Sequence, residues 1–181
     1  MNINYEILAE ECGLTNPDNL RKTAESLEKL NSKYEYDELV DICNYFLVTC
    51  TYPDKLSEII RFEDSLRNKK MLSALIDILL GKISTDDAYS QDDYINTRVM
   101  AAKAIANLKD TSAVNALLYC LDNKKENYKI RFACADALGK IGDRYAVAPL
   151  IEVVKDEDEK SVYLRESAAS ALGMLGDIRA V

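Results

Sequence analysis

Three segments of the chain repeat nearly the same sequence at a nearly constant spacing. They are RVMAAKAIANLKDTSAVNALLYCL from Arg98, RFACADALGKIGDRYAVAPLIEVV from Arg131 and RESAASALGMLGDIRAV from Arg165, and their starts lie 33 and 34 residues apart. A period of that size is typical of helical-hairpin arrays, in which each unit buries its apolar face only against its neighbours. The repeat therefore predicts an all-α fold, an α-α superhelix built as a solenoid of antiparallel helical hairpins.

Each repeat shows the apolar spacing of an α-helix twice. In the repeat from Arg131, the spacing i, i+3, i+4 and i+7 defines a first helix at Cys134, Ala137, Leu138 and Ile141. The second helix shows the same spacing at Val147, Leu150, Ile151 and Val154. Gly142 suits the position just past a helix end, and Asp143 is a good cap for the next helix. We therefore expect each repeat to be one helix pair, with small residues that let the paired helices approach closely.

The first half of the chain carries the same pattern in a weaker form. Leu27 and Leu30 stand 111 residues before Leu138 and Ile141, so a first hairpin is expected there, and essentially no β-strand anywhere. The predicted organisation is a single domain with a leading helix over 1–16, two degenerate hairpins over 17–81, an acidic loop over 82–94 and clear repeats over 95–181. We interpret the loop as a solvated insertion, with a partner-docking segment as the alternative.

The last repeat stops before its second helix. Its first helix carries the apolar residues Ala168, Ala171, Leu172 and Leu175, which we expect to lack a cover. Burial of each large aliphatic side chain is worth about 1.5–3 kcal/mol. We therefore expect the chain either to fray after about Ser161 or to self-associate through its uncapped C-terminal end. A fragment of a longer array is the other interpretation.

Composition narrows the function classes. The net charge is −8 and the pI about 4.7, so nucleic acid is a poor partner and a basic protein segment a better one. The chain has no His, which removes the usual general base and the usual zinc ligand. We find no nucleophile–base pair, phosphate-binding glycine loop or metal cluster, and expect no catalytic residue, cofactor or metal. With no secretory signal and no apolar run that could cross a bilayer, a cytoplasmic protein is expected.

Five cysteines follow no metal or disulfide spacing. They are Cys12, Cys43, Cys50, Cys120 and Cys134. Cys134 stands where the other repeats carry Ala101 and Ala168, so we interpret the cysteines as small core residues rather than ligands or nucleophiles.

The pattern R-x-x-A-A-x-A-L-G-x-I-G-D-x-x-A-V-x-P-L-I in these repeats resembles the HEAT-like repeat of the phycobilisome-lyase type. Residues 131–151 match it almost throughout, and the resemblance is clear over 96–181. It implies an armadillo-type α-solenoid. The family name records the attachment of bilin chromophores, but the repeat is also widespread in scaffold and regulatory proteins. The HEAT-like deoxyhypusine hydroxylases bind iron through His-Glu pairs, so their activity does not carry over to a chain without His.

In such arrays we expect the second helices to line the concave face. Helical spacing then exposes a mostly acidic row of candidate partner-binding residues, namely Asp37, Asp41, Asp77, Asn115, Tyr119 and Glu152. Carboxylates in line can hold a basic peptide or helix, although surface helix positions are often charged in any case.

Two other residue types recur near the repeat boundaries. Arg98, Arg131 and Arg165 open successive helices, and we expect them to pair with carboxylates of adjacent units or with exposed carbonyls, as in a structural ladder. Four tyrosines lie near helix ends or loops between units, where they suit edge packing or serve as interface anchors, namely Tyr119, Tyr128, Tyr145 and Tyr163.

The sequence therefore predicts a non-enzymatic scaffold that binds another protein on the concave face of the solenoid. The alternatives are a bilin lyase subunit or chromophore-attachment chaperone, and a regulatory HEAT region of a larger multidomain protein.

Overall fold

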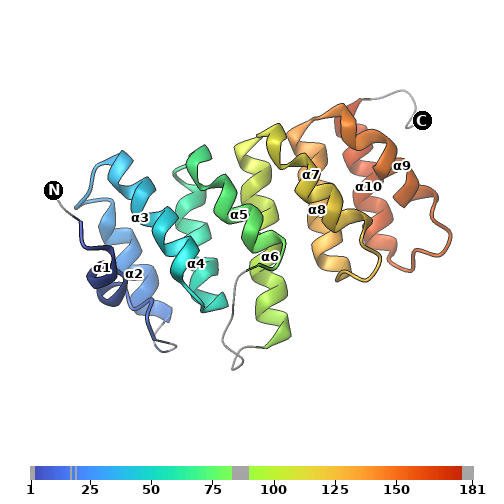
Figure 1. Cartoon of the computed structure of the whole chain (residues 1–181). Helices are drawn as coiled ribbons and strands as arrows, with labels where there is room; N and C mark the ends of the chain where they lie inside the picture. The colour runs from blue at the N-terminus through green and yellow to red at the C-terminus, as the bar shows by residue number, and fades with distance from the viewer. Residues whose placement is uncertain (1–2, 17, 19, 83–89, 177–181) are drawn as a thin grey trace.

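The structure, a computed structural model, describes residues 3–16, 18, 20–82 and 90–176 (Figure 1). Within these ranges it consists of helices and connecting turns, without β-strand. The α-helices are α1 Tyr5–Glu11, α2 Leu20–Leu30, α3 Tyr36–Thr49, α4 Pro53–Asp64, α5 Leu72–Leu79, α6 Gln91–Leu108, α7 Val114–Asp122, α8 Tyr128–Ile141, α9 Val147–Lys155 and α10 Val162–Leu175. Short 3-10 turns precede α5, α7 and α9, at Lys69–Met71, Thr111–Ala113 and Arg144–Ala146. The predicted all-α solenoid is confirmed.

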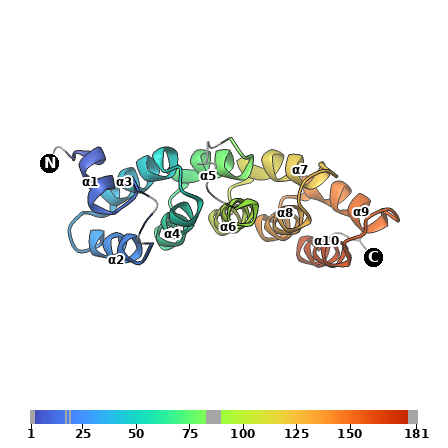
Figure 2. The ribbon, with the colours of Figure 1, turned by 90° about the horizontal axis from the view of Figure 1, so that it is seen from below.

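The helices form two rows that bend into a shallow arc. Figure 2 shows α3, α5, α7 and α9 in one row and α2, α4, α6, α8 and α10 in the other, which lies on the inside of the arc. Successive helices of the inner row pack directly against one another from α2 to α10, whereas α7 barely touches α5 or α9. Close packing on one side and splaying on the other produce the curvature.

This arrangement corrects the expectation that the second helices line the concave face. The second helices, α3, α5, α7 and α9, form the outer row, and the alanine-rich first helices form the inner one. The physical reason is side-chain size. A Cβ atom added to Gly139 of α8 would lie only 2.7 Å from the Cα of Ala171 in α10, so these two backbones nearly touch. Small residues thus draw the inner row together, and larger aliphatic residues keep the outer row apart.

The pairing of helices also differs from the expected one. Each helix of the inner row from α4 onward packs against the outer helix that precedes it, as α8 does on α7 and α10 on α9, whereas α8 barely contacts α9. As a result α10 has a covering helix. Ala168, Ala171 and Leu172 are buried and Leu175 is half-buried, so the prediction that they would be bare is wrong. The helix is continuous from Val162 to Leu175, and the argument for fraying or self-association through these residues loses its basis.

The helix boundaries follow from local caps. Asp143 accepts a hydrogen bond from the backbone N–H of Tyr145, and Asp110 accepts one from Ser112, so each aspartate starts the turn that leads into the next helix. Gly142 ends α8 with a φ of +82°, a conformation that favours glycine. Both roles agree with the sequence prediction.

The helix α6 begins earlier than the predicted acidic loop allows. Ser90 caps it by accepting a hydrogen bond from the backbone N–H of Asp93, and Asp92 and Asp93 lie in the first turn. Carboxylates there interact favourably with the positive end of the helix dipole. The acidic residues near position 92 therefore indicate the start of a helix rather than a loop. The remainder of that segment, residues 83–89, lies outside the described residues.

Two charged side chains are buried in the first half. Lys55 donates from Nζ to the carbonyl of Asp18 at 3.0 Å and also to the carbonyls of Gly13 and Asn16, which ties the start of α4 to the connection after α1. Glu63, near the end of α4, is 1% exposed, and its Oε2 has no hydrogen-bond partner among the described residues. Burial, together with a smaller effect of the neighbouring Asp64, raises the pKa of Glu63 to about 8.

The described cysteines are all buried free thiols, as the sequence analysis predicted. Burial raises the pKa of Cys43 to about 12 and that of Cys12 and Cys50 to about 11. A thiol with so high a pKa is a poor nucleophile near neutral pH, which agrees with a packing role.

Candidate functional site

The predicted acidic row lies on the outer face of the arc. Its members come from α3 (Asp37, Asp41), α5 (Asp77), α7 (Asn115, Tyr119) and α9 (Glu152). All are exposed except Asp77, which is half-buried. The helical spacing thus identified surface positions, but the structure places them on the convex side and not on the concave one.

Nearby lysines neutralise part of this row. The carboxylate of Asp77 lies 2.9 Å from Nζ of Lys82, and that of Asp41 lies 3.6 Å from Nζ of Lys70. Glu152 has no ion-pair partner among the described residues. The row is therefore less acidic than its sequence indicates, and its carboxylates without an ion pair among the described residues are Asp37 on α3 and Glu152 on α9.

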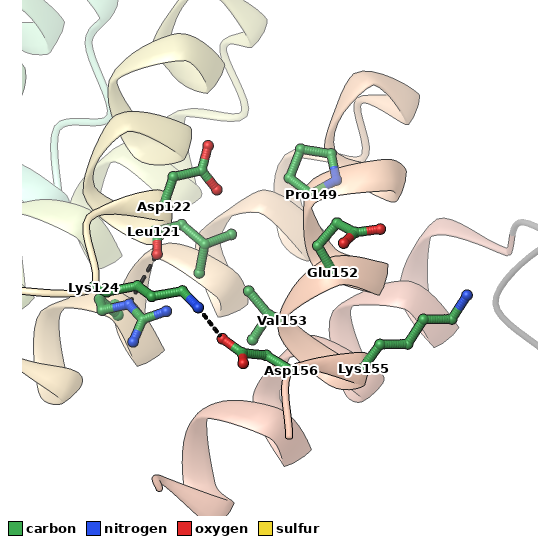
Figure 3. Close-up of a pocket in the computed structure, with 9 residues that line it drawn as sticks. Leu121, Asp122, Lys124, Pro149, Glu152, Val153, Lys155 and Asp156 are labelled. Carbon is green, nitrogen blue, oxygen red and sulfur yellow. Dashed lines mark hydrogen bonds and ion pairs between the residues drawn. The ribbon is translucent and has the colours of Figure 1, made fainter. Parts of the chain in front are cut away.

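Glu152 lines a small hollow of about 280 Å³ between α7 and α9 (Figure 3). Asp122 lies on the α7 side, opposite Glu152, and an ion pair of 2.7 Å between Lys124 and Asp156 closes the hollow beneath them. Burial raises the pKa of the Asp122 carboxyl, and the nearby Arg131 partly offsets that effect. The hollow has room for one side chain and carries charges of both signs.

Arg98 and Arg131 build the predicted structural ladder, whereas the third recurring arginine, Arg165, has no such partner among the described residues. Nε of Arg98 donates to the carbonyl of Leu79 at 2.8 Å, and Nη2 lies 2.6 Å from the carboxylate of Glu126. Arg131 repeats this arrangement one unit later, with Nε donating at 2.9 Å to the carbonyl of Leu121 and the guanidinium paired with Glu159. Both side chains therefore make contacts between neighbouring units, which agrees with a structural role.

A group of exposed apolar side chains lies on the last two helices of the inner row. They are Tyr128 and Phe132 on α8, and Val162, Tyr163 and Met174 on α10. Because α6 and α10 flank α8 and α7 lies behind it, an exposed side chain of α8 lies toward the inner surface or along its edge. A hollow of about 750 Å³ between the starts of α8 and α10 is lined by Tyr128, Val162 and Tyr163, together with polar residues.

Sequence reasoning found only part of this surface. It named Tyr128 and Tyr163 as possible anchors, together with Tyr119 and Tyr145, which lie on α7 and before α9. It did not identify Phe132 or Met174. Differences between the repeats could have identified Phe132, because the other units carry Val99 and Glu166 at the same position. Positions that vary inside a repeat are not needed for packing and are free to form a surface.

Two features are absent from the described residues. They contain no group of three or more His, Cys, Asp or Glu side chains placed to hold a metal ion. Among these residues no helix is both long and apolar enough to cross a lipid bilayer.

Comparison with known proteins supports the repeat assignment. Residues 84–173 match the sequence profile of HEAT repeats. The phycocyanobilin lyase subunit alpha of Picosynechococcus sp. is 44% identical over 79 residues, which cover 41% of this chain and 28% of that protein. The phycocyanobilin lyase subunit alpha of Nostoc sp. is 39% identical over 75 residues, 39% of this chain and 26% of that protein.

A relative with a different activity matches to a similar extent. Deoxyhypusine hydroxylase of Schizosaccharomyces pombe is 37% identical over 78 residues, 43% of this chain and 24% of that protein. The chain thus spans about a quarter of the length of these relatives. The repeat sequence, the two packed rows of helices and the profile match together show that the chain belongs to the HEAT-like repeat proteins.

Proposed function

We propose that this chain is a non-enzymatic interaction module that binds another protein on the concave face of its solenoid. The observation that carries the proposal is the group of exposed apolar side chains on α8 and α10, of which Tyr163 is 67% exposed, Met174 49% and Phe132 39%. Exposed aromatic residues and methionine are typical of the central part of protein interfaces. The outer row also exposes apolar side chains, but they are spread over α3, α7 and α9, whereas those of the inner row gather on α8 and α10, which pack directly against each other. We therefore assign the proposed contact to the inner row.

The surroundings of the patch fit a protein partner better than a small molecule. Lys140 forms an ion pair of 2.8 Å with Asp136 on the exposed side of α8, and Lys129 lies half-exposed near its start. A polar rim around apolar anchors is the usual arrangement of a protein interface. The hollow beside Tyr163 gives such a partner a place for one projecting side chain.

The test compares two exposed tyrosines on opposite faces. Tyr163 on the inner row and Tyr119 on the outer row are 67% and 69% exposed, so serine at either position removes a similar side chain without touching the core. The immobilised wild-type chain, Tyr163→Ser and Tyr119→Ser are each used to capture proteins from the source cell, and the retained proteins are quantified by mass spectrometry. We expect a protein retained by the wild type and by Tyr119→Ser but at least about tenfold reduced with Tyr163→Ser, as for an interface anchor. Equal retention by both variants contradicts the inner-face proposal.

We place this function in the cytoplasm. The described cysteines are free thiols, which suits a reducing compartment. Cell fractionation with an antibody against the chain tests the location, and recovery from a secreted or membrane fraction contradicts it.

A second candidate function is that of a bilin lyase subunit or a chaperone for chromophore attachment. The identity of 44% and 39% to two phycocyanobilin lyase alpha subunits favours it. The purified chain is titrated with free phycocyanobilin, and a shift of the visible absorption band that saturates at one equivalent supports it. An unchanged spectrum at micromolar chain and bilin contradicts bilin binding by the chain alone.

A further inference from the structure

The chain already holds one arginine between a tyrosine and a carboxylate. Cζ of Arg98 lies 5.6 Å from the centroid of the Tyr94 ring, and its Nη2 lies 2.6 Å from Oε2 of Glu126. A guanidinium suits these surroundings, because its face packs on an aromatic ring while its edge donates to the carboxylate. A tyrosine beside a carboxylate that lacks a cation therefore offers a place for an arginine from another protein.

Such a pair is exposed at the start of α10. Tyr163 and Glu166 are three residues apart on this helix, which makes their side chains neighbours. Both line the hollow of about 750 Å³, together with Tyr128 of α8 and Val162. Tyr163 is 67% exposed, and Glu166 is exposed without an ion-pair partner among the described residues. The tyrosine and the carboxylate of the Arg98 arrangement are thus both present here, without the arginine.

The exposure of both residues belongs to their position in the repeat. The residues 34 positions earlier are Lys129 and Phe132 of α8, and both are exposed although α10 packs against α8. Nζ of Lys129 lies 3.8 Å from the carboxylate of Asp92 at the start of α6, so this position faces the preceding inner helix. By the same register Tyr163 faces α8, which agrees with its place in the hollow beside Tyr128.

Two other charged residues line the hollow. Glu159 is already paired with Arg131, and it also accepts a hydrogen bond from the backbone N–H of Ser161. Lys160 belongs to the connection before α10 and attracts a negative group rather than an arginine. An acidic partner residue is therefore the alternative that a test must include.

We infer that Tyr163 and Glu166 bind an arginine side chain of the protein that docks on the inner face, while an adjacent apolar side chain of that protein enters the hollow. The inference rests on the proposed function, because it names the chemistry of the partner at the same surface. An apolar side chain in the hollow removes water from around Glu166, and a carboxylate that loses water without gaining a cation is costly. Glu166 therefore selects partners that carry an arginine next to the apolar anchor.

Capped dipeptides test this recognition directly. The probes are acetyl-Leu-Arg-amide, acetyl-Leu-citrulline-amide, which has nearly the same shape but no charge, and acetyl-Leu-Glu-amide, which offers an acid to Lys160. Binding is followed through the NMR signals of carbon-13-labelled tyrosine, and the Tyr163 signal is the one missing in Tyr163→Phe. We expect a saturable shift of that signal at millimolar arginine peptide, and an affinity lower by at least about fivefold for the other two peptides.

Two glutamate variants localise the effect. Glu166→Gln keeps the shape of the side chain and should lower the affinity for the arginine peptide to that of the citrulline peptide. Glu28→Gln changes an exposed glutamate of α2 in the same row of helices and should leave that affinity unchanged. The assignment is overturned by the absence of a saturable shift with the arginine peptide, by equal or tighter binding of either other peptide, or by an unchanged affinity in Glu166→Gln.

Capture from the source cell separates this inference from the proposed function. Loss of a captured protein with Tyr163→Ser, but its full retention by Glu166→Gln, leaves the inner-face contact in place and overturns the arginine recognition. Equal retention by Tyr163→Ser and Tyr119→Ser contradicts the inner-face contact itself. The peptide measurements do not depend on the captured protein, so the two failures are distinguishable.

Discussion

Glu63 should make the stability of the fold depend on pH. The side chain is 1% exposed, one carboxyl oxygen has no described partner, and burial raises its pKa to about 8 from a reference value of 4.5. In the unfolded chain the carboxyl ionises near pH 4.5, whereas in the folded chain it stays protonated up to about pH 8. The folded state therefore binds one more proton across this interval, and the free energy of unfolding must fall as pH rises.

The size of the effect follows from the same two values. At about 1.4 kcal/mol per pH unit, the interval from 4.5 to about 8 corresponds to a loss of at most about 5 kcal/mol. The contribution of the protonated carboxyl is fully present below pH 4.5 and is gone once the pH has risen through about 8. Against a typical total of about 5–15 kcal/mol for a domain, such a loss is large.

The assay is urea unfolding at pH 5, 6, 7 and 8 for the wild type, Glu63→Gln and the exposed control Glu28→Gln. We expect the wild type and Glu28→Gln to lose roughly 1 kcal/mol per pH unit, since relaxation of the site reduces the ideal slope of about 1.4. Glu63→Gln should be nearly flat, because its amide does not ionise. The chain has no His, so few other groups titrate in this range. Parallel slopes for the wild type and Glu63→Gln would refute the argument.

Three further outcomes are expected. Replacing the row carboxylates Asp41, Asp77 and Glu152 by lysine should leave circular dichroism unchanged and abolish any salt-sensitive binding of a basic peptide; unchanged affinity contradicts the row as a site. Arg131→Gln leaves a carboxylate buried without its partner and should lower the free energy of urea unfolding by about 3–5 kcal/mol; a loss below about 1 kcal/mol would place the pair among surface ion pairs. Gly139→Leu forces α8 and α10 apart and should lower the free energy of urea unfolding by about 1–3 kcal/mol. An unchanged free energy of unfolding would show that the two helices can separate at little cost.

The helices and their small-residue faces were predictable because both follow from local spacing. The period of 33–34 residues fixes the order of the helices, and apolar residues at i, i+3, i+4 and i+7 fix which face is buried. These signals do not show which neighbouring helix covers a buried face. A helix such as α8 has a helix before it and one after it, and the spacing in its sequence is the same whichever of them covers it.

That ambiguity explains both errors at the level of the array. Pairing α8 with α9 leaves the apolar residues of α10 without a cover, whereas the observed pairing with the preceding helix buries Leu172 at 3% exposure. The prediction also placed the second helices on the concave face, whereas they form the outer row. The acidic row that these helices carry therefore lies on the convex side. The distinguishing quantity was the distance at which helices pack, which depends on residues such as Gly139 and Ala171 that lie in different repeats.

Repetition and divergence carry different information in such a chain. Arg98 and Arg131 recur because each holds its own unit to the next through a paired carboxylate. At the position one residue later the units carry Val99, Phe132 and Glu166, and no common packing role requires this variation. Conserved positions within the array build its core, so the surface that distinguishes this protein from other arrays must be formed by the divergent ones. The exposed aromatic residue Phe132 is therefore a stronger indication of a partner than the repeated arginine beside it.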